Sequence, residues 1–76
     1  MAGTPQSEIL AEMVASVLSV AVTTGDEVAA GDTAILLESM KMEIPVLIEQ
    51  AGTVLEVRVA AGDLVQEGDV LVVLAH

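Results

Sequence analysis

The octapeptide Gly-Asp-Glu-Val-Ala-Ala-Gly-Asp occupies residues 25–32, and a variant of it, Gly-Asp-Leu-Val-Gln-Glu-Gly-Asp, occupies residues 62–69. The two copies are 37 residues apart, and the same shift places residues 13–37 on residues 50–74 without a gap. Similarity at a fixed period marks a duplicated structural unit. Because neither copy can bury its own apolar face, the sequence predicts two halves that pack as a sandwich or flattened barrel around a pseudo-two-fold axis.

Strand-like alternation surrounds each octapeptide. The residues predicted to share one strand face are Leu18, Val20 and Val22 in the first half and Leu55, Val57 and Val59 in the second. A period of two is typical of a half-buried strand. Within the octapeptides, Val28 and Val65 are predicted to point inward from short strands between glycine turns. The composition is 54% hydrophobic and contains no aromatic residue, so the sequence predicts an all-β domain with an aliphatic core.

The aspartates of the two octapeptides allow two interpretations. They are Asp26, Asp32, Asp63 and Asp69. Carboxylates can bind calcium, but the spacing lacks the dense oxygen ligands and the closing glutamate of a calcium loop. Gly-Asp is a common turn sequence. We therefore interpret these aspartates as turn residues.

Charge and composition exclude several classes of function. Twelve acidic residues against one lysine and one arginine give a formal net charge of −10. This charge disfavours nucleic acids and anionic membranes as partners, because both attract clustered Lys and Arg. Charge alone favours solubility as its explanation, and it also suits a monomeric domain that meets basic partner surfaces. Disulfides and thiolate metal sites are excluded, because cysteine is absent.

The length of 76 residues allows one domain. We expect residues 1–7 to be a disordered segment and residues 8–76 to form the domain. Nothing at the start has the basic and apolar regions of a signal peptide, and no apolar run reaches the roughly 20 residues of a membrane span. A cytoplasmic location is therefore expected.

Residues 38–49 lie between the two halves and read as a hairpin. Pro45 cannot donate a ladder hydrogen bond, which predicts that the second strand of this hairpin is an edge strand or is bulged. Met40 and Lys41 are predicted to form the turn, and Glu38 then faces Glu43. Two-residue turns of this kind prefer Asn-Gly or Asp-Gly, and directly opposed like charges are destabilising. Violations of stability rules occur preferentially at functional sites.

Lys41 is the only lysine of the chain. A shift of 37 residues in either direction moves this position to Thr4 or just beyond His76. The pseudo-two-fold axis therefore relates the turn to the region where the two chain ends lie. We expect the lysine at the end of the domain that lies opposite both termini.

The segment Glu38-Ser39-Met40-Lys41-Met42-Glu43 resembles the biotin attachment motif of biotin carboxyl carrier domains, whose centre is Met-Lys-Met. The Gly-Asp turns are also similar to that family, and the resemblance covers roughly residues 8–75. It implies a flattened barrel of two four-stranded antiparallel sheets related by a quasi-dyad. Residues 23–27 are too few for the protruding thumb of some family members, so the domain is expected to be thumbless. At this length the chain resembles a small free-standing carrier.

The resemblance also implies a function. Biotin would be attached covalently to Lys41 by biotin protein ligase, with Glu38, Ser39, Met40, Met42 and Glu43 in ligase recognition. The domain would then carry carboxyl groups between biotin carboxylase and carboxyltransferase. It would be a carrier and a ligase substrate rather than an enzyme.

Two other functions stay open. A lipoyl carrier domain shares the fold and the hairpin lysine, with lipoate as the cofactor, but its motif typically has Asp before the lysine and Ala after it. An unmodified interaction module of the same fold would not need an exposed Met-Lys-Met turn. An independent enzyme has little support, because the only histidine, His76, is expected to fray at the terminus and no phosphate-binding glycine loop is present.

Overall fold

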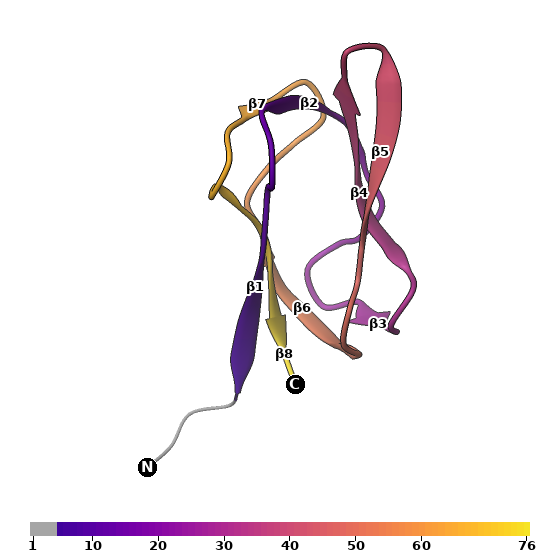
Figure 1. The fold of residues 1–76 in the computed structure, drawn as a ribbon. Helices are drawn as coiled ribbons and strands as arrows, with labels where there is room; N and C mark the ends of the chain where they lie inside the picture. Colours follow the sequence, from indigo (N-terminus) through magenta and orange to yellow (C-terminus); the bar gives the residue numbers. More distant parts are fainter. Residues whose placement is uncertain (1–4) are drawn as a thin grey trace.

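The computed structural model describes residues 5–76, which form eight β-strands and no helix (Figure 1). The strands are β1 (Gln6–Leu10), β2 (Ala15–Val20), β3 (Glu27–Val28), β4 (Thr33–Ser39), β5 (Met42–Leu47), β6 (Gly52–Val57), β7 (Leu64–Val65) and β8 (Val70–Ala75). The all-β prediction is confirmed. Only six residues separate β2 from β3, so the loop that carries a thumb in some carriers is short here. The described residues include no helix that could cross a bilayer.

The strands form two four-stranded antiparallel sheets, with the orders β1-β8-β6-β3 and β5-β4-β2-β7. The shift of 37 residues exchanges β1 with β5, β2 with β6, β3 with β7 and β4 with β8. This exchange converts one strand order into the other, so the predicted pseudo-two-fold symmetry is confirmed. Each sheet contains strands from both halves of the chain, and each half therefore completes the sheets of the other.

The core between the sheets is aliphatic. Its buried members are Ala11, Ala15, Val17, Val22, Val28, Ala34, Ile35, Leu37, Ile48, Val54, Val65, Leu71, Val72 and Leu74. The short strands β3 and β7 each contribute one of these residues, Val28 and Val65, as predicted. Small and branched aliphatic side chains fill the space without aromatic rings, which suits the close approach of two short sheets.

Each Gly-Asp turn is built in the same way. In the second half, the backbone N–H of Ala60 donates to Oδ2 of Asp63 over 2.9 Å, and the N–H of Asp63 donates to the carbonyl of Ala60 over 3.0 Å. Equivalent pairs of bonds join Thr23 with Asp26, Ala29 with Asp32 and Gln66 with Asp69. The preceding glycines have φ between 92° and 95°, which L-residues rarely adopt. These bonds confirm that the aspartates are turn residues.

The predicted alternation is wrong at one position in each half. Leu18 is 38% exposed and Leu55 is 40% exposed, whereas the preceding residues, Val17 and Val54, are buried. The strand register shifts at both leucines. Such a β-bulge places two residues opposite one on the partner strand and so moves the following side chains to the other face. The other residues of both predicted sets pack in or against the core.

The two ends of the described chain are held more tightly than expected. Strand β1 begins at Gln6 and pairs with β8, so Gln6 and Ser7 are not part of a disordered segment; residues 1–4 of the predicted segment lie outside the described residues. His76 does not fray. Its backbone N–H donates to the carbonyl of Pro5 over 2.9 Å, and Nε2 lies 2.6 Å from Oγ of Ser7. Nδ1 donates to the carbonyl of Ala51 over 2.8 Å.

Candidate functional site

The hairpin of β4 and β5 protrudes at the end of the molecule opposite the start of β1 and the end of β8 (Figure 1). Ser39 pairs with Met42 and Glu38 with Glu43. Met40 and Lys41 therefore form a two-residue turn, as the sequence predicts. Strand β5 is the outermost strand of its sheet, which confirms the edge position expected from its proline. We call this end of the molecule the lysine pole and the opposite end the terminal pole.

The turn holds both of its residues in the left-handed region. Met40 has φ of 53° and Lys41 has φ of 66°, and they are the only non-glycine residues with positive φ in the described part of the chain. Positive φ at both central positions is the mark of a type I′ hairpin turn. Each non-glycine residue in this conformation costs roughly 1–2 kcal/mol. The turn therefore presents Lys41 on a tight and well-defined backbone at the expense of stability.

The side chains of the turn point into solvent. Met40 is 89% exposed, Met42 is 59% exposed and Lys41 is exposed as well. Among residues 5–76 the one ion pair joins Arg58 to Glu56, so Lys41 takes part in none there. Its amine is therefore accessible to a partner enzyme.

The structure gathers all of the residues predicted for ligase recognition on this hairpin. Glu38 and Glu43 form the second-to-last pair of the ladder, and both are exposed. Ser39 and Met42 form the last pair, directly below the turn. The carboxylates of Glu38 and Glu43 therefore lie opposite each other on the two strands, close to the turn that carries the Lys41 amine. The arrangement can present an amine for acylation by an enzyme, but the described residues near the turn offer no histidine that could act as a base.

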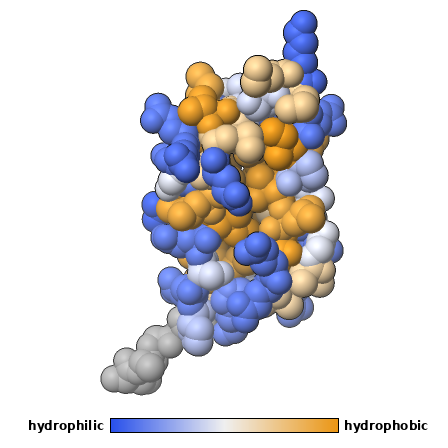
Figure 2. All heavy atoms as spheres, viewed as in Figure 1, coloured by the Kyte–Doolittle hydropathy of each residue, from blue (hydrophilic) through white to orange (hydrophobic). Residues whose placement is uncertain are grey.

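A groove runs along the opening between the edge strands β1 and β5. Figure 2 shows apolar side chains gathered along the middle of this face, framed by hydrophilic ones. The lining includes Ile9, Leu10, Ile44 and Val46, and none of the residues of the turn. The groove is therefore a surface separate from the site around Lys41.

The family model described as "Biotin-requiring enzyme", for biotin and lipoyl attachment, matches residues 6–74. This match covers both sheets and the hairpin. The chain belongs to this family. Biotin is the cofactor that the family description names, which agrees with the cofactor expected from the Met-Lys-Met motif. The fold of this family member is that of a cofactor carrier, with its accessible lysine at one pole.

Two relatives have high sequence identity over a shorter stretch. A "Biotinylated protein TB7.3 homolog" of Mycolicibacterium smegmatis is 65% identical over 40 residues, which are 53% of this chain and 56% of the relative. "Biotinylated protein TB7.3" of Mycobacterium tuberculosis is 62% identical over 40 residues, with the same coverage. The aligned part thus spans about half the length of the curated relatives that this family member matches.

Two solved structures share the fold. The Kluyveromyces lactis urea carboxylase superposes with a TM-score of 0.86 at 28% identity, over 97% of this chain and 6% of that protein. A single-chain, multi-domain long-chain acyl-CoA carboxylase superposes with a TM-score of 0.89 at 27% identity, over 99% of this chain and 7% of that protein. This family member therefore resembles one small domain within each of these large enzymes.

Proposed function

We propose that this domain is a biotin carboxyl carrier that is biotinylated on Lys41 by a biotin protein ligase. The observation that carries the proposal is the placement of the only lysine at an exposed, strained hairpin turn between two exposed methionines, in a domain of the biotin family. The relatives named as biotinylated proteins support biotin as the attached group.

The residues present fit a covalent attachment. The amine of Lys41 is exposed and lies outside any ion pair of the described residues, so acylation breaks no contact of the fold. The turn itself is held by the β4–β5 ladder rather than by the lysine side chain. Modification can therefore proceed without a change of backbone conformation.

The ligase must supply the activation. A lysine amine is protonated at neutral pH and is then not a nucleophile. In the loading reaction, Nζ of Lys41 forms an amide bond with the carboxyl carbon of biotinyl-adenylate, the bond from that carbon to the phosphate oxygen breaks, and AMP leaves with the electron pair. A ligase base takes the amine proton. The role of this chain is to hold the amine where the ligase can reach it.

The domain acts as a carrier once it is loaded. Biotin supplies a ureido nitrogen that can hold a carboxyl group between a biotin carboxylase and a carboxyltransferase. Tethering raises the effective concentration of the group at both active sites. The two carboxylases that share the fold contain such a domain within a larger chain. This supports a role for the present domain as the carrier of a carboxylase.

The test is the intact mass of the domain produced with an active biotin protein ligase, combined with streptavidin binding. We expect the mass of one biotinoyl group, and we expect its loss in Lys41→Arg, which keeps the charge and removes the only lysine. An unmodified wild-type chain in the presence of active ligase refutes the proposal. A gain of one lipoyl group instead establishes a lipoyl carrier.

A further inference from the structure

The pseudo-two-fold symmetry supplies an internal comparison between the two poles. Leu64 on β7 and Glu27 on β3 are related by the shift of 37 residues, and both begin a two-residue strand with an exposed side chain. Each also pairs with an equivalent residue, Leu64 with Ser16 and Glu27 with Thr53. The two positions therefore have the same strand pairing and a similarly exposed side chain in the fold. Folding therefore does not require leucine at one position and glutamate at the other.

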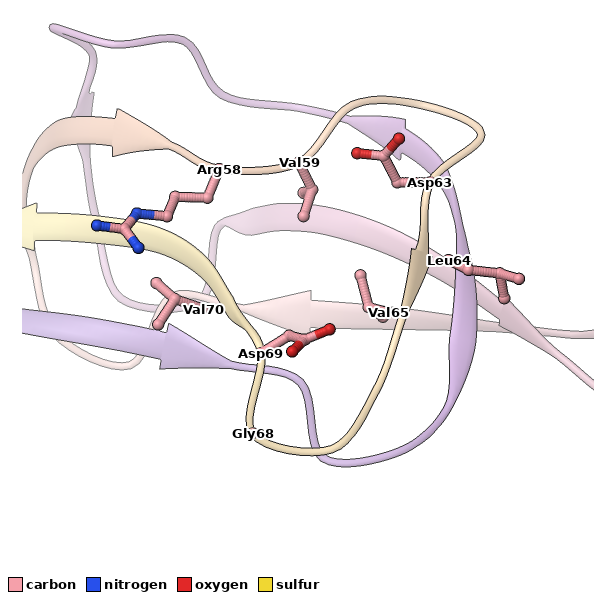
Figure 3. A pocket seen from close by; sticks show the side chains of 8 residues that line it. All are labelled: Arg58, Val59, Asp63, Leu64, Val65, Gly68, Asp69 and Val70. Atoms are coloured by element: carbon pink, nitrogen blue, oxygen red, sulfur yellow. The ribbon is translucent and has the colours of Figure 1, made fainter.

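Leu64 lies on the same face and the same row as the carboxylates of the hairpin. In the sheet β7-β2-β4-β5, Leu64 is opposite Ser16, Ser16 is opposite Glu38, and Glu38 is opposite Glu43. The next residue, Val65, is buried in the core, so Leu64 faces outward and is 74% exposed. Leu64 also lines the hollow that Val59 and Val65 line, and Figure 3 shows its side chain extending away from theirs.

The distance from Leu64 to the lysine is short enough for one partner to contact both. Adjacent strands are about 4.8 Å apart, so two strand spacings place Leu64 about 10 Å from Glu38. Lys41 is three residues further along the hairpin, about 10 Å at most. The turn carries Lys41 over to the β5 side, one further strand spacing from β7, so the Cα atoms of Leu64 and Lys41 are about 16 Å apart. An interface of about 800 Å² on one partner corresponds to a disc of about 16 Å radius.

The most exposed large apolar side chains of the described residues all lie at this pole. They are Met40 (89%), Leu64 (74%), Val14 (62%) and Met42 (59%), and we call them the lysine-pole patch. Val14 directly precedes the first residue of β2, which pairs with Val65 of β7. The dyad-related counterpart of Val14 at the terminal pole is Ala51, a smaller residue. Leu64 shares the outer face of the sheet with Glu43, whereas Met42 precedes Glu43 on β5 and therefore faces the other side. Exposed apolar side chains at one end of a domain favour an interaction surface there.

We propose that Leu64 and Val14 extend the ligase-binding surface of the hairpin across the sheet to β7, and that they contact the biotin protein ligase during loading. This proposal rests on the function proposed for Lys41. The ligase must cover the lysine pole to reach the amine. The patch is flanked by Glu38 and Glu43, so the matching ligase surface has an apolar centre with a basic rim.

The experiment compares Leu64→Gln with Glu27→Gln, which create the same residue at dyad-related positions of opposite poles. Both variants are biotinylated by purified ligase over a range of domain concentrations, with the product measured by mass. We expect Leu64→Gln to lower kcat/KM about 5- to 20-fold, mainly through KM, because an apolar contact made before and during the reaction is lost. Glu27→Gln should stay within about 2-fold of wild type, and Leu64→Met should recover most of the loss.

Thermal unfolding of the same variants shows whether each is folded, and no core contact is removed because both side chains are exposed. Loading of Leu64→Gln with the kcat/KM of wild type overturns the inference while leaving the proposed function intact. An equal loss in both glutamine variants also overturns it, because the effect would not be specific to the lysine pole. Absence of modification in wild type refutes the proposed function itself.

Discussion

The strained turn of the hairpin leads to a quantitative prediction. Replacement of Met40 by Asn and Lys41 by Gly installs the residue pair that a type I′ turn prefers. The backbone already has φ of 53° and 66° at these positions, so the new residues need no rearrangement. Met40 is 89% exposed, so its loss removes almost no buried apolar surface. The double variant should therefore be more stable than wild type.

The size of the gain follows from the cost of the left-handed conformation. Glycine at position 41 removes the cost of the left-handed conformation, which stabilises the folded state by roughly 1–2 kcal/mol. Glycine also raises the conformational entropy of the unfolded chain, which offsets about 0.5–1 kcal/mol of this gain. Asparagine tolerates the left-handed region and relieves part of the strain at Met40. With about half of the same cost recovered at Met40, the net stabilisation is about 1–2 kcal/mol. For a domain of this size, each kcal/mol raises Tm by about 4–8 °C.

The assay is thermal unfolding of the unmodified domain, followed by circular dichroism and calorimetry. The matched control is Met42→Asn, which introduces the same residue on the strand beside the turn, where β-propensity is lost and no stabilisation is expected. If the double variant unfolds at or below the temperature of wild type, the turn is not strained and the reasoning fails. Under the proposed function, the same variant accepts no biotin because it lacks the lysine. The substitution would then raise the stability of the domain and abolish its function.

Three further changes test the packing and the turns. Gly52→Ala should destabilise the domain by about 1–3 kcal/mol, because its methyl group would meet the Ala75 carbonyl and lie 2.9 Å from Nδ1 of His76; an unchanged urea midpoint would contradict this. Asp63→Ala removes the acceptor of the Ala60 N–H and should cost about 1 kcal/mol in chemical denaturation, whereas full retention of stability would show that the bond contributes nothing. Ile35→Val, at a fully buried position, should cost about 0.5–1.5 kcal/mol, and a loss within experimental error would mean that the core closes around the missing methylene.

Much of the site could be predicted from the sequence because its determinants are local. The turn at Met40 and Lys41, and the pairing of Glu38 with Glu43, follow from the position of the insertion between the two halves and from the strands on either side. The edge position of Pro45 follows from its missing N–H. These features depend on residues within a few positions of one another.

The position of Leu64 at the lysine pole was not predicted. Its place on the same row as Glu38, two strands away, depends on β7 pairing with β2, a contact between residues almost 50 positions apart in the chain. The signal was nevertheless present, since Leu64 replaces Glu27 in the second octapeptide. Only the structure shows that this difference falls at the lysine pole.

The sequence by itself determined the duplication, the Gly-Asp turns, the aliphatic core and the lysine at the hairpin turn, because each depends on periodicity and turn chemistry. The tertiary structure decided the interleaving of strands from both halves, the bulges that expose Leu18 and Leu55, and the bonds that hold His76. These features arise when distant strands close into two packed sheets. Closure requires local changes of register and brings together side chains whose proximity no local pattern encodes.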